Sequence, residues 1–263
     1  MSITIGSTSS DSVGVIVEAY PSRIIPDRKQ AVFEVVGRNG DIVDVYGARS
    51  MQSFSNYIQQ YDIYMNAESV GLEQRARRVA KWLYNSSTLG YAERGYIELQ
   101  DSYEPDYYRE AYFVGPADVA STLARFGRCT ISFSCKPQKF LLSGQTSIPL
   151  TSGTNTFTNP SNLGGGIGWY SHPRLYFVNL TGPVKLQFEN GTYRLNVPTT
   201  QTWITWDTDT GEVINSSGLV NNYLEYVNTW DMPFLNTKLY ITPDAGVTFD
   251  TPASTIRPRW WLL

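Results

Sequence analysis

The sequence contains few of the residues on which enzyme chemistry most often depends. Its 263 residues include two cysteines and a single histidine, His172, which directly precedes Pro173. A histidine-based triad would have to use that one residue, and no Gly-x-Ser-x-Gly nucleophile motif occurs. A zinc site needs several cysteine or histidine ligands, which the chain lacks at any suitable spacing. We therefore expect a protein that is not an enzyme, with no catalytic residue, no metal and no cofactor.

Long apolar segments are also missing. The first residues, MSITIG, contain neither a basic segment nor an apolar run, so they predict no signal peptide. No stretch approaches the roughly 18 consecutive apolar residues of a membrane span. The formal net charge is -3, which excludes a global basic field for tight nucleic-acid binding. We expect a soluble protein that is made in the cytosol and does not insert into a membrane.

Aromatic and turn-forming residues are abundant by contrast. Aromatics make up 14% of the chain, including 18 Tyr and 7 Trp, together with 21 Gly and 14 Pro. This composition favours a mainly β protein with many turns. Asn-Gly pairs at 39–40 and 190–191 predict tight hairpins, the first between residues 31–36 and 42–46, the second between 184–188 and 193–197.

One helix stands out, over residues 70–84, where apolar residues recur at steps of three and four. Its other face carries Arg77, Arg78 and Lys81, which suit either solvent or the acidic residues of a neighbouring subunit. A strand over residues 128–135 alternates apolar and polar residues. Cys129 and Cys135 both lie on it, about 20 Å apart at 3.3 Å per residue, too far to form a disulfide. We expect two buried thiols.

Composition changes near residue 140. Residues 1–140 hold 15 Lys/Arg and 16 Asp/Glu, whereas residues 141–263 hold 6 and 8. We therefore predict a boundary between a domain at 1–140, a β-sandwich with one helix, and a domain at 141–255. The second reads as a sandwich or jelly roll of short strands, with 239–242 and 246–249 as its final pair. The tail at 256–263 ends in WWLL and is too apolar to remain in water, so it should dock.

Two loops resemble ligand sites only superficially. Residues 164–168 are GGGIG, but no Lys-Ser/Thr follows and no helix begins there, so we predict a plain loop. The run Asp207-x-Asp209-x-Gly211-Glu212 has its glycine one position early for a calcium loop and lacks the final bidentate Glu. Asp and Gly favour turns, and we predict a hairpin there.

Aromatic residues of the second domain suggest a binding surface. Trp169, Trp203 and Trp206 are candidate contacts for a glycan or a protein partner, because aromatic faces stack on sugar rings and dominate interfaces. Core packing is the alternative use for each of them. Trp203 and Trp206 are an odd number of residues apart, so an ideal strand would bury one and expose the other.

Several motifs together resemble the distal tail (Dit) proteins of phages with long, non-contractile tails. They are RRVAKWL at 77–83, PDYYREA at 105–111 and the strand ending in CKP at 135–137, with VVGRNGD at 35–41 similar to the family's early Gly-Arg-x-Gly hairpin. The resemblance extends over nearly the whole chain, and the motifs occur in the family's order.

The resemblance implies a structural virion protein of the tail tip. Members of the family form a hexameric ring from the N-terminal β-sandwich with its one helix, and a long hairpin of each subunit embraces its neighbour. The C-terminal domain is galectin-like or like a carbohydrate-binding module, and the last residues of the chain return to the ring domain. The stretch between Tyr46 and Tyr64 contains no Asn-Gly turn, so the sequence does not place the embracing hairpin.

The partners implied are the tail tube protein on one side of the ring and, on the other, a tail-associated lysin, tail fibre or receptor-binding proteins. DNA passes through the lumen only in transit, and assembly takes place in the bacterial cytoplasm. The alternative from a different class is a carbohydrate-binding module that recognises a host cell-surface glycan. An enzyme ranks third, because carboxylate pairs of the glycosidase kind have no local support here.

Overall fold

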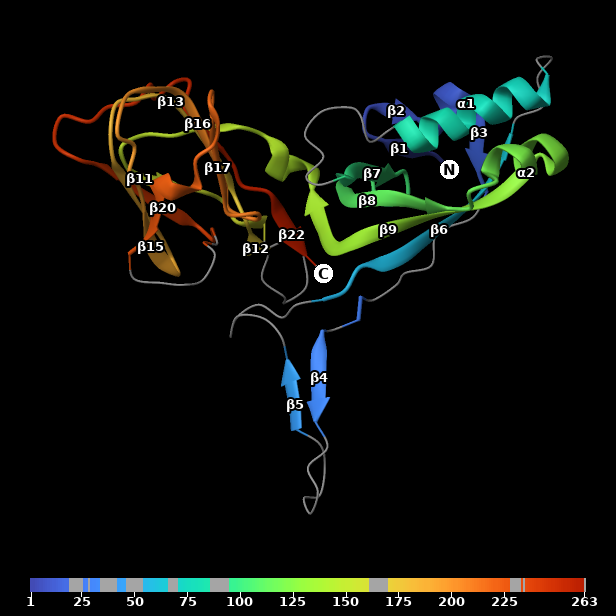
Figure 1. Ribbon diagram of the computed structural model, residues 1–263, viewed down its shortest axis with the longest axis horizontal. Coiled ribbons are helices and arrows are strands. Elements are labelled where there is room, and N and C mark those ends of the chain that lie inside the picture. Colours follow the sequence, from blue (N-terminus) through green and yellow to red (C-terminus); the bar gives the residue numbers. More distant parts are fainter. Residues whose placement is uncertain are drawn as a thin grey trace. The chain divides into compact units, whose positions relative to one another are not determined.

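The computed structural model divides the chain into two compact units (Figure 1). The described residues are 1–18, 26–27, 29–33, 42–45, 54–65, 71–85, 95–160, 170–227, 233 and 235–262. The first unit comprises residues 1–139 and the second residues 140–262. Strands dominate both units, which confirms the mainly β prediction. No helix in the described ranges is long and apolar enough to cross a membrane.

The first unit combines an antiparallel sheet with two α-helices. Its elements in chain order are β1 (Ile3–Ile5), β2 (Thr8–Ser9), a 3-10 turn (Ser10–Val13), β3 (Val15–Val17), β4 (Gln30–Phe33), β5 (Ile42–Val45), β6 (Tyr57–Met65), α1 (Leu72–Asn85), β7 (Ile97–Asp101), β8 (Tyr107–Gly115), α2 (Val119–Phe126) and β9 (Arg128–Leu141). The sheet runs in the order β9-β8-β7-β1-β2, and β6 pairs with both β3 and β9.

The core of this unit lies between the sheet and the helices. Ala76 and Val79 of α1 and Leu123 of α2 belong to the same buried cluster as Ile63 of β6 and Ile131 of β9. On β6 the side chains alternate between buried and exposed positions from Ile58 to Ile63, and Tyr64 is half-buried, so one face of the strand meets the core and the other faces outwards. The predicted helix is thereby confirmed. On β9 the predicted alternation is confirmed up to Phe133, with Ile131 and Phe133 buried, but Ser134, predicted to lie on the polar face, is buried as well.

A second helix, α2, is an addition to the one that the sequence predicted. It has eight residues, of which Val119 and Leu123 are buried one turn apart, and it ends at Gly127 in the left-handed conformation with φ of 69°. The expectation of a single helix in the first unit was therefore wrong, because two buried residues are too short a pattern to be read as a helix.

β4 and β5 form a two-stranded sheet of their own. Phe33 pairs with Ile42, which confirms the hairpin predicted there, although its Asn-Gly turn lies outside the described residues. Neither strand is hydrogen-bonded to any other strand in the described part of the chain.

The second unit is a sandwich of two antiparallel sheets. Its elements are a 3-10 turn (Leu142–Gln145), β10 (Ile148–Pro149), β11 (Gly153–Thr156), β12 (Tyr170–Ser171), β13 (Arg174–Leu180), β14 (Val184–Phe188), β15 (Gly191–Leu195), β16 (Gln201–Asp207), β17 (Glu212–Asn215), β18 (Gly218–Leu219), a second 3-10 turn (Asn221–Tyr223), β19 (Leu224–Tyr226), β20 (Lys238–Pro243), β21 (Thr255–Arg257) and β22 (Trp260–Leu262). One sheet has the order β10-β21-β13-β16-β17-β18 and the other β11-β20-β14-β15-β19, while β12 pairs with β22.

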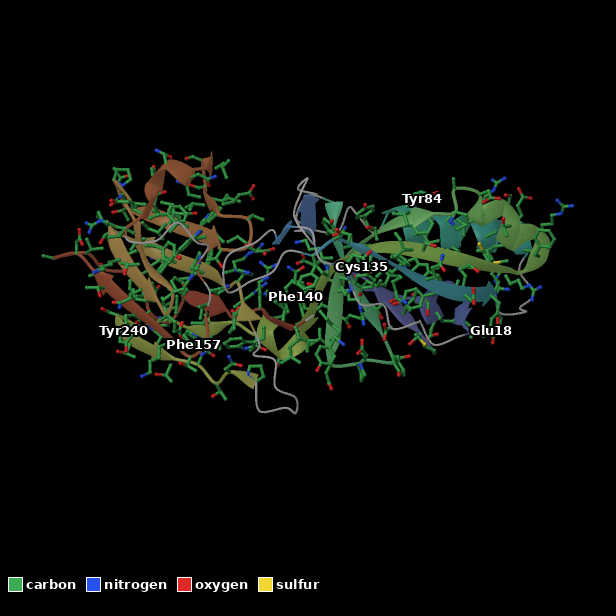
Figure 2. All side chains as sticks on the ribbon, turned by 90° about the horizontal axis from the view of Figure 1, so that it is seen from below. Glu18, Tyr84, Cys135, Phe140, Phe157 and Tyr240 are labelled. Atoms are coloured by element: carbon green, nitrogen blue, oxygen red, sulfur yellow. The ribbon has the colours of Figure 1, made fainter. Side chains whose placement is uncertain are left out.

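Aromatic rings join the two sheets of the sandwich. Trp206 of β16 packs edge-on against Phe188 of β14 at 6.0 Å between ring centroids, and its centroid is 5.4 Å from that of Tyr193 on β15. On the five-stranded sheet, Tyr240 is more than a third exposed while the nearby Phe157 is buried; both are labelled in Figure 2. The hairpins predicted at 190–191 and 207–212 are confirmed by the β14–β15 and β16–β17 pairings.

Residues 246–249 were predicted to be a strand, and this was wrong. Val247 donates its backbone N–H to the carbonyl of Asp244 in a turn, with Gly246 at φ of 79°. Thr248 bonds instead to Thr181, so this segment closes a loop rather than extending a sheet.

The C-terminal segment packs against the second unit. The Arg259 N–H donates to the Gly144 carbonyl at 2.9 Å, and the Ser171 hydroxyl donates to the Pro258 carbonyl. Trp260 and Trp261 are 5% exposed, which is consistent with the expectation that the tail does not remain in water. Its docking on the first domain remains a prediction.

Candidate assembly interface

Helix α1 presents cations on its outer face because the apolar residues along its middle turn inwards, although Leu72 and Tyr84 near its two ends are exposed. Arg77, Arg78 and Lys81 are exposed, whereas the neighbouring Ala76 and Val79 are buried. Arg77 pairs with Glu73 at 2.6 Å one turn earlier, and both side chains are about three-quarters exposed. A pair in that position contributes less than about 1 kcal/mol to stability, so it is free to exchange partners.

A shallow depression of about 540 Å³ lies between α1 and α2. Its lining residues are Glu73, Arg77, Ala120, Ser121, Ala124 and Arg125. At its α2 end the guanidinium of Arg125 sits 5.2 Å from the ring centroid of Phe126, which is 64% exposed. Small side chains on α2 form one wall, and arginines from both helices stand at the sides. We call Arg77, Arg78, Lys81 and Arg125 the basic helix face.

The outward side of β3 and β6 carries acids instead. The Glu18 N–H, just after β3, donates to the Asp62 carbonyl of β6 at 2.8 Å, so the two residues lie side by side on adjacent strands. Both are exposed, and both follow buried neighbours in the alternation. The Thr130 hydroxyl of β9 donates to Asp62 Oδ1 at 2.5 Å. We call Glu18 and Asp62 the acidic strand face.

Outward side chains elsewhere on β6 are mostly polar. The Gln60 amide donates to the Ser132 hydroxyl at 3.3 Å, and Ile58 is 45% exposed. This outward face of β6 and β9 bears amides, hydroxyls and a carboxylate together with one apolar residue, a mixture that suits contact with another protein surface.

A buried ion cluster fixes the turn between β7 and β8. Arg109 donates to Asp101 at 3.2 Å and to Glu104, and its Nε donates to the Tyr57 hydroxyl at 2.9 Å. Lys139 also reaches Glu104, at 2.5 Å. Burial alone would raise the pKa of the Glu104 carboxyl, but hydrogen bonds from Lys139 and Arg109 lower it below its ordinary value. Burial raises the pKa of Tyr57 to about 12. The cluster is a structural support, since each charge in it is neutralised by another.

The aromatic residues singled out in the sequence occupy different environments. Trp203 is half-buried on the outer side of β16, where its ring stacks on Tyr176 with centroids 6.4 Å apart. Trp206 is 1% exposed and belongs to the core, so it offers no face to a ligand. The prediction that it contacts a glycan or a partner was therefore wrong. The opposite orientations of Trp203 and Trp206 match the odd spacing. Trp169 lies outside the described residues.

The single histidine and the Asp207 turn, both considered as possible sites from the sequence, are held in the structure by contacts with neighbouring residues. Burial lowers the pKa of His172, whose ring stacks on Trp261 at 5.9 Å between centroids. Asp207, at the end of β16, binds Arg174 at 2.7 Å and Arg259 at 3.1 Å, and accepts the Asp209 N–H in a turn. That carboxylate is therefore engaged by arginines rather than directed at a cation site.

Within the described residues, no three His, Cys, Asp or Glu side chains gather as metal ligands. Residues 164–168 lie outside the described part.

The cysteines are both free, but only one is fully buried. Cys135 is buried, and Cys129 is half-buried near the start of β9, so the prediction of two buried thiols holds for Cys135 alone. Cys129 is less covered because it sits beside the exposed end of the strand.

Sequence reasoning missed half of the charged surface. It identified Arg77, Arg78 and Lys81 from helical spacing, but neither Arg125 nor the acidic strand face. Arg125 depends on α2, which was not predicted. Glu18 and Asp62 are 44 residues apart in the chain, and only the register of β3 on β6 brings them together. The alternation of β6 was a usable signal for placing Asp62 outwards.

Comparison with known proteins gives a likeness in structure alone. No protein-family model matches the sequence, and no curated protein matches it. Among solved structures, the chain is similar to the Dit protein (gp 19.1) of phage SPP1, described as a paradigm of the hub adsorption apparatus in phages that infect Gram-positive bacteria. The identity is 13% and the TM-score 0.54, over 97% of this chain and 96% of that one. The phage P2 baseplate, in its activated conformation with Ca, gives 9% identity and a TM-score of 0.46, over 93% of this chain and 90% of that one. At 13% identity, the likeness to the SPP1 protein shows a shared fold.

Proposed function

We propose that this chain is a structural protein of a phage tail tip, the hub of a baseplate. The observation that carries the proposal is that a hub protein shares the fold over nearly the full length of both chains, both units included. Function lives in sites rather than in folds, so the surfaces of this chain must support the role as well. The proposal assigns no catalytic residue and no cofactor to the chain.

We assign the ring to residues 1–140, as a homo-hexamer. A closed cyclic ring requires that two different surfaces of each subunit meet around the axis. The first unit has two such surfaces of opposite charge, the basic helix face and the acidic strand face. Their difference in sign favours head-to-tail association over a two-fold dimer.

The β4–β5 pair supports the same assembly. A lone two-stranded hairpin is at best marginally stable in water, and these strands pair with no other strand in the described part of the chain. A neighbouring subunit would supply the missing packing surface. We therefore assign to the paired strands β4 and β5 the neighbour-embracing role that the sequence did not place.

In this role the ring would join the tail tube to the tail-associated lysin, fibre or receptor-binding proteins, with DNA passing through its lumen during ejection. The chain would be assembled in the host cytoplasm and located at the tail tip of the virion. The stacked and half-exposed rings of Tyr176 and Trp203 give the second unit an outward aromatic surface for partners.

The same two rings favour the alternative function, a module that binds a host cell-surface glycan, since aromatic faces stack on sugars. Binding of the protein to cell-wall polysaccharide on an array, lost in Trp203→Ala and kept in Tyr240→Ala, would favour this alternative. Tyr240 is a matched control because it is an aromatic residue that is 38% exposed and lies on the other sheet.

The mass in solution tests the proposal. Light scattering should give six copies of the 29.6 kDa chain, about 178 kDa, or twice that for two stacked rings. A monomer at every concentration tested would contradict the ring and favour the glycan-binding module.

A further inference from the structure

The basic helix face carries positive charges for which the described part of the subunit supplies few counter-charges. Arg78 and Lys81 are exposed, and neither makes an ion pair with any residue in the described ranges. Arg77 pairs with one carboxylate of the described part of the chain, the exposed Glu73, and Arg125 extends the positive surface across the depression onto α2. The face therefore carries four cations and one carboxylate.

The acidic strand face, in contrast, carries negative charges for which the described residues supply no cation. Glu18 and Asp62 sit side by side on adjacent strands, where like charges repel. No cation among the residues that the structure describes pairs with either carboxylate. Among the described residues, the Asp62 side chain accepts a hydrogen bond from Thr130 alone, which is neutral. A cation brought from outside would relieve the repulsion.

The two faces cannot satisfy each other within one subunit. Val79 of α1 and Ile63 of β6 lie in the same core, so the outer face of α1 and the outer face of β6 point away from each other across it. Figure 1 shows α1 and β6 on opposite sides of the first unit. In Figure 2, Tyr84 of α1 and Glu18 appear at opposite edges of that unit. A second copy can bring the complementary face to each.

We propose that the acidic strand face of one copy docks on the basic helix face of the next, as the repeating contact of the ring. This inference rests on the proposed function and names the residues that meet. The row of outward β6 side chains would lie along α1 beside the depression, with Asp62 and Glu18 facing Arg78 and Lys81. Because the contact joins two different surfaces, every subunit uses each face once and the ring closes without an exposed charged end.

Charge reversal on both sides tests the contact. Arg78→Glu with Lys81→Glu makes both faces acidic, and Glu18→Lys with Asp62→Lys makes both basic. Each double variant alone should lose the ring, with at least about a tenfold rise in the concentration needed for half assembly. All four residues are exposed, so the variants should keep the circular dichroism and melting temperature of the natural protein.

Mixing the two variants provides the decisive readout. In an equal mixture, the unchanged acidic strand face of one meets the unchanged basic helix face of the other, and the two reversed faces also complement each other. A ring of six can alternate the two variants, so the mixture should regain the hexamer mass. The matched control, Lys185→Glu with Lys238→Glu, makes the same charge change on exposed residues of the second unit and should keep the ring.

The outcomes separate this inference from the proposed function. Rings in the natural protein and in both variants alone would overturn the contact while leaving the hexamer in place. Loss of rings in each variant without recovery in the mixture would also overturn it, since simple complementarity would be absent. A natural protein that forms no ring under any condition would overturn the hexamer itself, and the contact with it.

Discussion

The Nη1 atom of Arg109 lies 3.2 Å from Oδ2 of Asp101, with both side chains buried in the first unit. Asp101 ends β7 and also accepts the Tyr103 and Glu104 N–H groups, while Arg109 belongs to β8. The pair therefore shapes the turn between two neighbouring strands and anchors it to the sheet. Removing the Asp101 charge would leave Glu104 to balance two cations of the buried cluster, Arg109 and Lys139.

Asp101→Asn should lower the free energy of unfolding by about 3–5 kcal/mol, the range for breaking a buried ion pair. Denaturant titration of the natural and variant proteins measures the difference. Glu73→Gln serves as the control, because its pair with Arg77 is about three-quarters exposed. That change should cost less than about 1 kcal/mol. Equal effects of the two substitutions would contradict the buried cluster.

The protein should lose stability as the pH falls below about 6.5. Burial lowers the pKa of His172 from its ordinary value of 6.5, so the folded state favours the neutral ring. The stabilisation is then complete at a pH above the pKa of His172 in the unfolded chain, and it is lost as the pH falls through the lower pKa of the folded state. His172 is the only histidine, so its NMR signal can be followed without ambiguity. If the His172 signal titrated in the folded protein with a midpoint at or above pH 6.5, the buried environment of the ring would be contradicted.

Cys135 should resist thiol reagents in the folded protein. Burial raises the pKa of its thiol to about 12, so almost no thiolate is present at neutral pH. Cys129 is half-buried, and burial raises its pKa as well, so it should react slowly. Cys129→Ser should leave the native protein unlabelled, with one thiol per chain appearing on unfolding. Fast labelling of native Cys129→Ser would show that β9 is open.

Gly144→Ala should loosen the C-terminal segment. A Cβ at that position would lie 2.7 Å from the Trp260 backbone nitrogen and 3.3 Å from the Cα of Arg259, so the segment would have to shift. We expect a loss of about 1–3 kcal/mol, measured as a lower denaturation midpoint. Gly71→Ala is the control, because a Cβ there meets nothing within 4 Å. A neutral Gly144→Ala would contradict the close packing.

Local patterns predicted those elements whose signals are short-range. The Asn-Gly pair at 190–191 located the β14–β15 hairpin, and the spacing of Ala76, Val79 and Leu83 located α1 within two residues at each end. Helix α2 was missed because its eight residues bury only two apolar side chains. The segment at 246–249 was wrongly predicted to be a strand, because it closes a loop on Thr181 instead of pairing with another strand.

The candidate site was only half predictable for a different reason. A helix face can be read from spacing along one segment, and Arg77, Arg78 and Lys81 were found in this way. The acidic strand face depends on the register between two strands far apart in the chain. The buried cluster likewise joins Tyr57, Asp101 and Arg109 from three strands, and no local pattern relates them.

The central claim is that six copies form a ring, and electron microscopy of the purified protein in negative stain tests it most directly. Two-dimensional class averages should have sixfold symmetry and an open centre, as single or stacked rings. Uniform small particles without a central opening, or rings of another symmetry, would contradict the account.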